Sequence, residues 1–142
     1  MPDYNYCVAL SITHPTLDPS DITEALGTKA TRSRKFGEPR VSTKGKLLKG
    51  VNKESFWSLD LHKEKRLQAS SIYLEDFISE QNVRFKEHEV FFGNLLKSGG
   101  YIEYFIGWFS TGNINMCITL SPELLLETAE LHISVGICAY PE

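Results

Sequence analysis

The chain has 142 residues, of which 42% are hydrophobic and 23% are charged, and its net charge is −3. This composition excludes a fibrous repeat and a largely disordered chain. No apolar run approaches the roughly 20 residues of a membrane span, and residues 1–5 lack the features of a signal peptide, so we expect one cytoplasmic domain over residues 1–142 with no membrane contact.

The first 27 residues predict a strand followed by a capped helix. Residues 4–13 alternate, and every second side chain on one face is apolar: Tyr6, Val8, Leu10 and Ile12. Asp18 then suits an N-cap and Pro19 a first helical position, while Gly27 suits the left-handed residue that ends a helix. We therefore predict a short helix over residues 19–26.

Residues 28–53, here called the basic loop, hold nine of the 15 basic residues and only one of the 18 acidic ones, Glu38. The loop thus carries +8 and the rest of the chain −11. Such a split is typical of a loop that binds anions or nucleic acid on an acidic body. Alternatively, a solvated loop folds back over the acidic remainder.

The middle of the chain predicts a strand and two helices. Residues 54–62 alternate, with Trp57, Leu59 and Leu61 on one face. From Arg66 the apolar spacing becomes helical, and we expect Asn82 to end that helix. A second helix is predicted from Phe85 to the glycine pair at 99–100.

The last third predicts strands over 101–110 and 114–119, joined by a turn at 111–113, and a strand over 132–140. The first is apolar on both faces, which favours a central position in a sheet. Between the last two strands, Ser121 as N-cap and Pro122 after it predict a helix. The strand at 132–140 is expected at an edge, where a homodimer could pair.

This order favours an α+β two-layer sandwich: a mixed, mostly antiparallel sheet of about five strands, with short helices mainly on one face and a partly ferredoxin-like character. The two helix starts, Leu17-Asp18-Pro19 and Leu120-Ser121-Pro122, are alike. They suggest a weak internal strand–helix–strand duplication, over residues 6–62 and 101–140, although good helix starts also converge on such residues.

No catalytic, metal or cofactor motif is found. The three cysteines, Cys7, Cys117 and Cys138, have no C-x-x-C spacing, which argues against a zinc site and a disulfide framework and fits a reducing compartment. Serine-hydrolase elbows and phosphate-binding glycine loops are also absent. We therefore assign no catalytic residue, no metal ligand and no cofactor, and an enzyme of unrecognised class stays open.

Aromatic residues in the predicted strands are the more promising feature. If one face of the sheet is open, exposed aromatics beside basic residues would form a binding surface. The alternative is ordinary core packing, which is favoured for Trp57 and left open for Trp108. The candidate binding residues are Arg32, Arg34, Lys35, Arg40, Trp57 and Trp108.

Several runs resemble a bacterial family, domain of unknown function 4279. They are LDPSDITEALGTKATRSRKFGEPR, FWSLDL, YIEYFIGWFSTG and LSPELLLETAELHISVGICAY; the matching positions include Gly27, Gly37, Pro39, Trp57 and Tyr140. Departures are Ala30, Phe36 and Cys138, the last in place of an acidic residue. The resemblance implies small uncharacterised bacterial proteins and, by analogy, immunity-type partners of toxins.

Three functions follow as hypotheses. The first is a non-enzymatic protein-binding module, for example of the immunity type, whose acidic surface includes Glu75, Asp76 and Glu80. The second is anion or nucleic-acid binding through the basic loop, with Arg32, Arg34, Lys35 and Arg40 as contacts. The third is the enzyme of unrecognised class.

Overall fold

Strand β1 (Tyr4–His14) lies inside a six-stranded sheet in the computed structural model, which describes residues 4–110 and 117–140. The strand order is β2 (Arg32–Arg34), β5 (Ser55–Asp60), β1, β7 (Tyr101–Ser110) and β8 (Ser134–Tyr140), and β6 (Leu67–Gln68) also pairs with β1. Only β7 and β8 run parallel. The predicted α+β class and mostly antiparallel sheet are confirmed.

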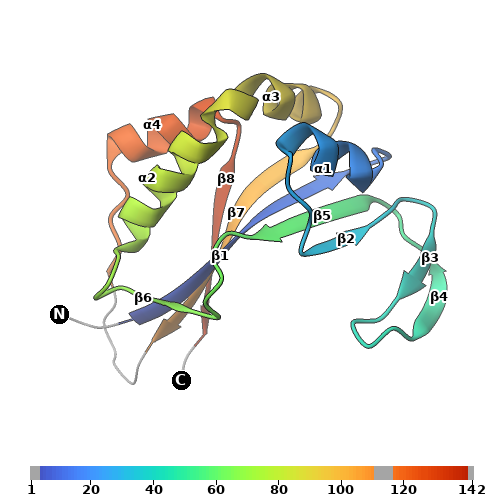
Figure 1. Ribbon diagram of the computed structural model, residues 1–142, viewed down its shortest axis with the longest axis horizontal. Coiled ribbons are helices and arrows are strands. Elements are labelled where there is room, and N and C mark those ends of the chain that lie inside the picture. The colour runs from blue at the N-terminus through green and yellow to red at the C-terminus, as the bar shows by residue number, and fades with distance from the viewer. Residues whose placement is uncertain (1–3, 111–116, 141–142) are drawn as a thin grey trace.

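Four helices cover one face of this sheet: α1 (Pro19–Leu26), α2 (Leu74–Phe85), α3 (Glu89–Lys97) and α4 (Pro122–Glu130) (Figure 1). A short 3-10 turn, η1 (Lys86–His88), joins α2 to α3. The predicted caps of α1 and α4 are confirmed, because the Asp18 carboxylate accepts from the Ser20 N–H at 2.9 Å and the Ser121 hydroxyl from the Leu124 N–H at 3.2 Å. Gly27 ends α1 with a φ of 68°.

The core lies between the helices and this one face of the sheet. It is built from the alternate strand residues that the sequence predicts, among them Tyr6, Leu10, Trp57, Ile102 and Tyr104, all fully buried. Because successive strand residues point to opposite sides, the other half of the strand residues lies on a face that no helix covers.

The middle of the chain differs from its prediction. Residues 67–68 form β6, and α2 starts only at Leu74. Asn82 does not end this helix but lies within it, since its amide finds buried partners. The periodic apolar residues before Leu74 do reach the core, but Leu67 does so from a short strand whose backbone pairs with β1.

The basic loop contains three strands that the sequence reading missed. β2 pairs with β5, while β3 (Pro39–Val41) and β4 (Leu47–Val51) form a separate hairpin with every residue exposed. These short, exposed strands carry no apolar alternation, so periodicity cannot detect them. Residues 111–116, the predicted turn and the start of the next strand, lie outside the described residues, and 117–119 form no strand.

The two strand–helix–strand units differ in direction. β1 and β5, on either side of α1 in the chain, pair antiparallel, whereas β7 and β8, on either side of α4, pair parallel. The similar helix starts of the two units therefore lead into different strand geometries.

A buried chain of hydrogen bonds joins the two layers. The Tyr104 hydroxyl on β7 donates to Asn82 Oδ1 at 2.9 Å, and Asn82 Nδ2 donates to the Thr128 hydroxyl on α4 at 2.9 Å. Thr128 in turn donates to the Leu124 carbonyl. Burial raises the pKa of the Tyr104 hydroxyl, which keeps it protonated as a donor.

We expect Asn82→Ala to lower the free energy of unfolding by about 1–3 kcal/mol, because it leaves a buried hydroxyl without an acceptor. Urea denaturation followed by circular dichroism measures this. Asn94→Ala, the same change at an exposed position of α3, is the control and should stay within about 0.5 kcal/mol of the wild type. An equal effect of both variants would contradict the buried network.

His14 fastens the end of β1 to the turn before α1 and to the end of α3. Its Nδ1 accepts from the Thr16 and Leu17 N–H groups at 3.1 and 3.0 Å, and its Nε2 lies 2.8 Å from the Ser98 hydroxyl. The Nε2 nitrogen is therefore assigned the proton. Burial lowers the pKa of His14 below its usual value of about 6.5.

This shift predicts a loss of stability in mild acid. Above pH 6.5 His14 contributes its full share to the free energy of unfolding. This contribution declines as the pH falls towards the lower pKa of the folded state, because the unfolded chain binds the proton first. His14→Asn should flatten the dependence of the unfolding free energy on pH between 5 and 7. His132→Asn, at an exposed histidine, should keep the wild-type slope.

Candidate functional site

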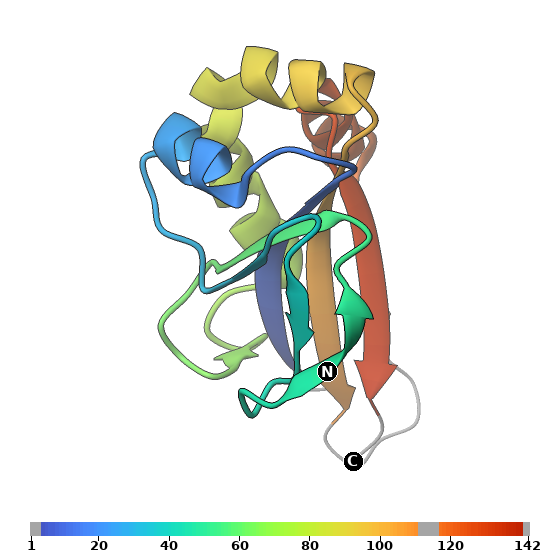
Figure 2. The same ribbon diagram turned by 90° about the vertical axis from the view of Figure 1, so that its right-hand side faces the viewer.

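The face of the sheet turned away from the helices, here called the open face, is the candidate site (Figures 1 and 2). The pairing register places on it the alternate residues of five strands: Arg32 and Arg34 of β2, Phe56, Ser58 and Asp60 of β5, Cys7, Ala9, Ser11 and Thr13 of β1, Tyr101, Glu103, Phe105, Gly107 and Phe109 of β7, and Ser134, Gly136, Cys138 and Tyr140 of β8.

Two adjoining hollows mark this face. One, of about 310 Å³, lies over β1 between Phe56 and Tyr101, and the other, of about 380 Å³, extends to Arg66 and Phe109. Both are lined by Ala9, Arg32 and Phe105, so they meet along one line across the sheet. In the first hollow, small side chains of β1 form the floor and aromatic rings form the walls, whereas the second is bordered by Phe105, Phe109 and the charged residues 63–66.

Arginines lie against two of these rings. The Arg66 guanidinium is 3.6 Å from the centre of the Phe109 ring, and that of Arg34 is 4.7 Å from the centre of Phe56. Phe109 also stacks on Tyr140 of β8, with ring centres 5.2 Å apart. Cation–π contacts hold the guanidinium planes over the sheet, where they can face a ligand.

Two glycines of this face lie directly under neighbouring side chains. A Cβ on Gly107 would lie 2.8 Å from Cys7 Sγ, and one on Gly136 would lie 2.6 Å from the Glu103 carboxylate. Glu103 also accepts from the Tyr101 hydroxyl at 2.8 Å. The close packing of side chains over these glycines fixes the shape of the β7–β8 part of the face.

The structure separates the basic residues that the sequence grouped together. Arg32 and Arg34 lie on the open face, and Arg32 is 3.6 Å from Asp60. Lys35 instead pairs with Asp18 at 3.1 Å beside the start of α1, and Arg40 donates to the Lys49 carbonyl inside the hairpin. The Ser20 backbone N–H and the Lys35 ammonium both lower the pKa of the Asp18 carboxyl.

Neither tryptophan lies on the open face. Trp57 is completely buried under α1, where its indole donates to the Thr23 hydroxyl at 3.0 Å, so it cannot contact a ligand at the surface. Trp108 is half-buried on the helix side and packs edge-on against Tyr4. Core packing, the alternative given for Trp57, is what the structure has.

The aromatic residues of the site are therefore Phe56, Tyr101, Phe105, Phe109 and Tyr140. The sequence analysis noticed aromatics in the strands but did not select these. The signal that identifies three of them is the spacing of Tyr101, Phe105 and Phe109, four residues apart, opposite the fully buried Ile102, Tyr104 and Ile106. Nothing in the local sequence relates Arg66 to Phe109.

A family model, described as a domain of unknown function, DUF4279, matches residues 3–142. The chain belongs to the DUF4279 family. The resemblance seen in the sequence is thereby confirmed. No curated protein and no solved structure gave a match.

Charge in this DUF4279 protein is divided between the two layers. The helices and η1 together hold ten acidic residues (Asp21, Glu24, Glu75, Asp76, Glu80, Glu87, Glu89, Glu123, Glu127 and Glu130) and three basic ones (Arg84, Lys86 and Lys97). Of the 18 acidic and 15 basic residues, this leaves eight acidic and twelve basic ones elsewhere. The helix layer is thus negative, and the sheet with its hairpin and loops is positive.

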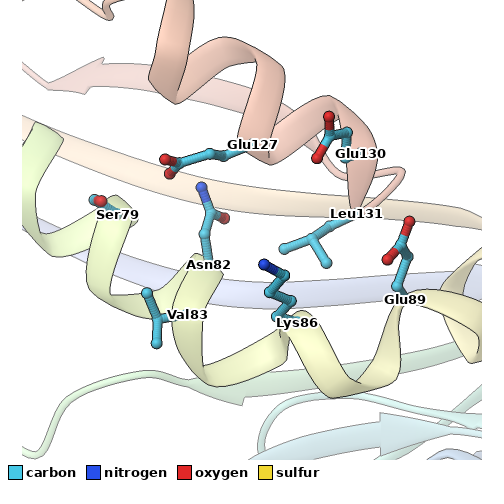
Figure 3. A pocket seen from close by; sticks show the side chains of 8 residues that line it. All are labelled: Ser79, Asn82, Val83, Lys86, Glu89, Glu127, Glu130 and Leu131. Carbon is cyan, nitrogen blue, oxygen red and sulfur yellow. The ribbon is translucent and has the colours of Figure 1, made fainter.

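A smaller cleft of about 170 Å³ lies between α2 and α4 (Figure 3). Glu127 and Glu130 of α4 face Lys86 and Glu89 across it, and Asn82 and Leu131 lie deeper. The buried Asn82 side chain is hydrogen-bonded to Tyr104 and Thr128. The polar groups of the cleft that can contact a partner are therefore mainly carboxylates.

One residue beside the second hollow, a histidine, has both ring nitrogens engaged by the backbone. This residue is His62: its Nε2 accepts from the Val8 N–H at 3.0 Å and its Nδ1 lies 2.6 Å from the Glu64 carbonyl. Both ring nitrogens are therefore used to close a gap in the pairing of β1. Among residues 4–110 and 117–140, no group of three His, Cys, Asp or Glu side chains could hold a metal. In the same ranges, no helix has the length and apolar character of a membrane span.

Proposed function

We propose that this DUF4279 protein binds a single-stranded nucleic acid across the open face, without a chemical step. The observation that carries the proposal is the pair of hollows that share Phe105 and Arg32: Phe56 and Tyr101 complete the aromatic side of the first, and Phe109 lies beside the charged residues 63–66 in the second. Bases stack on exposed rings, and guanidinium groups beside those rings pair with the phosphates.

The geometry supports a flat ligand in particular. Ala9, Ser11 and Gly107 leave the centre of the face low, whereas Phe105, which is 37% exposed, rises between the two hollows. A base on either side of this ring would contact the ring and lie within reach of an arginine. A single strand can present unpaired bases in this way, whereas a duplex cannot.

The basic hairpin would extend the contact with phosphates. At its base, Asn52 bonds to Lys35, Gly37 and Glu38, and the Phe36 N–H donates to the Ser55 hydroxyl of β5. Arg40, Lys44, Lys46 and Lys49 are all exposed on it. Such an arm fits a polyanion that continues beyond the sheet.

We expect the protein to bind a fluorescent oligothymidylate at low salt, with log K falling linearly against log salt at a slope of about −2 to −3, which corresponds to three or four neutralised phosphates. Phe105→Ala should weaken binding about 5- to 150-fold at an unchanged slope, because it removes stacking and no charge. Arg32→Gln should make the slope shallower by about 0.7. Fluorescence anisotropy measures all three.

Lys97→Gln on α3 is the matched control, since it removes one positive charge from the helix side and should leave the slope as it is. If the wild type does not bind at low salt, the proposal is wrong. If Lys97→Gln weakens binding as much as Arg32→Gln does, the binding is nonspecific electrostatic attraction and the open face is not the site.

A second candidate, the protein-binding module, is favoured by the acidic cleft. Three carboxylates line the space between α2 and α4, and Val83 beside them is exposed. A helix with lysines beside leucines would meet both charge and apolar surface there.

A synthetic lysine- and leucine-containing helical peptide is the probe for this candidate. Glu127→Lys with Glu130→Lys should slow its association at least about 10-fold at low salt, measured by stopped-flow fluorescence. The control, Glu54→Lys with Glu64→Lys, makes the same change outside the helix layer. Equal rates for the two double variants would remove this candidate.

A further inference from the structure

The two edges of the sheet differ in how far they are protected from pairing. One edge, β2, is three residues long and two of them are arginines, which blunts it against further strands. The other edge is β8, the red strand beside β7 in Figure 2. It has seven residues, Ser134–Tyr140, and none of them is charged or a proline. Within the described residues, the backbone of β8 pairs with β7 and with no other strand.

The helix above this edge is uncharged on the same side. In α4, Glu123, Glu127 and Glu130 lie on one half of the helix, and Glu127 and Glu130 face α2 across the cleft. The 100° step per residue places Pro122, Leu125 and Ala129 on the opposite half, away from α2. All three are exposed, and Leu125 is 49% exposed.

We propose that a second copy of the chain covers this edge, with β8 pairing antiparallel to its counterpart across a two-fold axis at Ile137. Ile137 is the middle residue of the strand and 39% exposed. In this register Ile137 lies opposite Ile137 of the second copy, Val135 lies opposite its Ala139, and Gly136 lies opposite its Cys138. Each pair joins small or apolar side chains, and no pair brings two charges together.

The occupant follows from the distribution of charge. The rest of the surface is either the acidic helix layer or the basic sheet side. Pairing this uncharged edge with a charged surface would bury unpaired charges, whereas pairing it with a second uncharged edge would not. A two-fold axis brings two such edges together and leaves the acidic halves of the two α4 helices turned away from each other. The inference stands independently of the proposed ligand, because it concerns the edge and not the open face.

Analytical ultracentrifugation across micromolar concentrations is the test. The wild type should sediment at twice the chain mass of 16.1 kDa. Ile137→Lys combined with Leu125→Lys should sediment as a monomer, because both copies would place lysines at the contact. Leu48→Lys on the exposed hairpin makes the same change elsewhere and should leave the dimer intact. A wild type that stays monomeric, or a double variant that stays dimeric, overturns the proposal.

A cross-link tests the register even if the lysine variants fail to fold. Ile137→Cys, in a chain with Cys7, Cys117 and Cys138 changed to serine, should form a disulfide-linked dimer under mild oxidation, since facing residues of antiparallel strands are close enough for one. Val41→Cys in the same background should not. A monomeric wild type that binds a synthetic peptide of residues 134–140 would assign the edge to a foreign strand instead.

Discussion

The pairing of β1 along both of its edges is the interaction on which the rest of the molecule depends. β7 pairs with it from Tyr4 to Thr13, and β5, His62 and β6 succeed one another along the opposite edge. Because β1 is paired along both edges, the alternation of its side chains determines which side chains of the neighbouring strands lie on each face of the sheet. One face receives the large apolar side chains and all four helices, and the other keeps small residues and rings at the surface.

Much of this arrangement is predictable from sequence, because its signals are local. The caps at Asp18 and Ser121, the alternation of β1 and β7 and the central place of β7 all come from neighbouring residues. The failures have a common cause. Asn82 looks like a helix breaker until Tyr104 and Thr128, distant in sequence, satisfy its amide. The exposed hairpin carries no apolar pattern because it covers no core.

The candidate site was predictable in kind but only partly in its residues. Positive charge and strand aromatics led to the prediction of a binding surface, and the structure places Arg32 and Arg34 on the open face. The register decides the rest: it turns Trp57 inward and brings Phe105 between two hollows. The contact of Arg66 with Phe109 joins segments that are 43 positions apart in the sequence, and no local rule relates them.

The opposite charges of the two layers give the molecule a permanent electric moment across its sheet. The field of a polyanion exerts a torque on this moment, so the molecule would rotate during the approach and arrive with its sheet side leading. Orientation before contact reduces the number of unproductive encounters. For the proposed polyanion, the acidic helices would therefore contribute to recognition at a distance, although they lie on the side turned away from the open face.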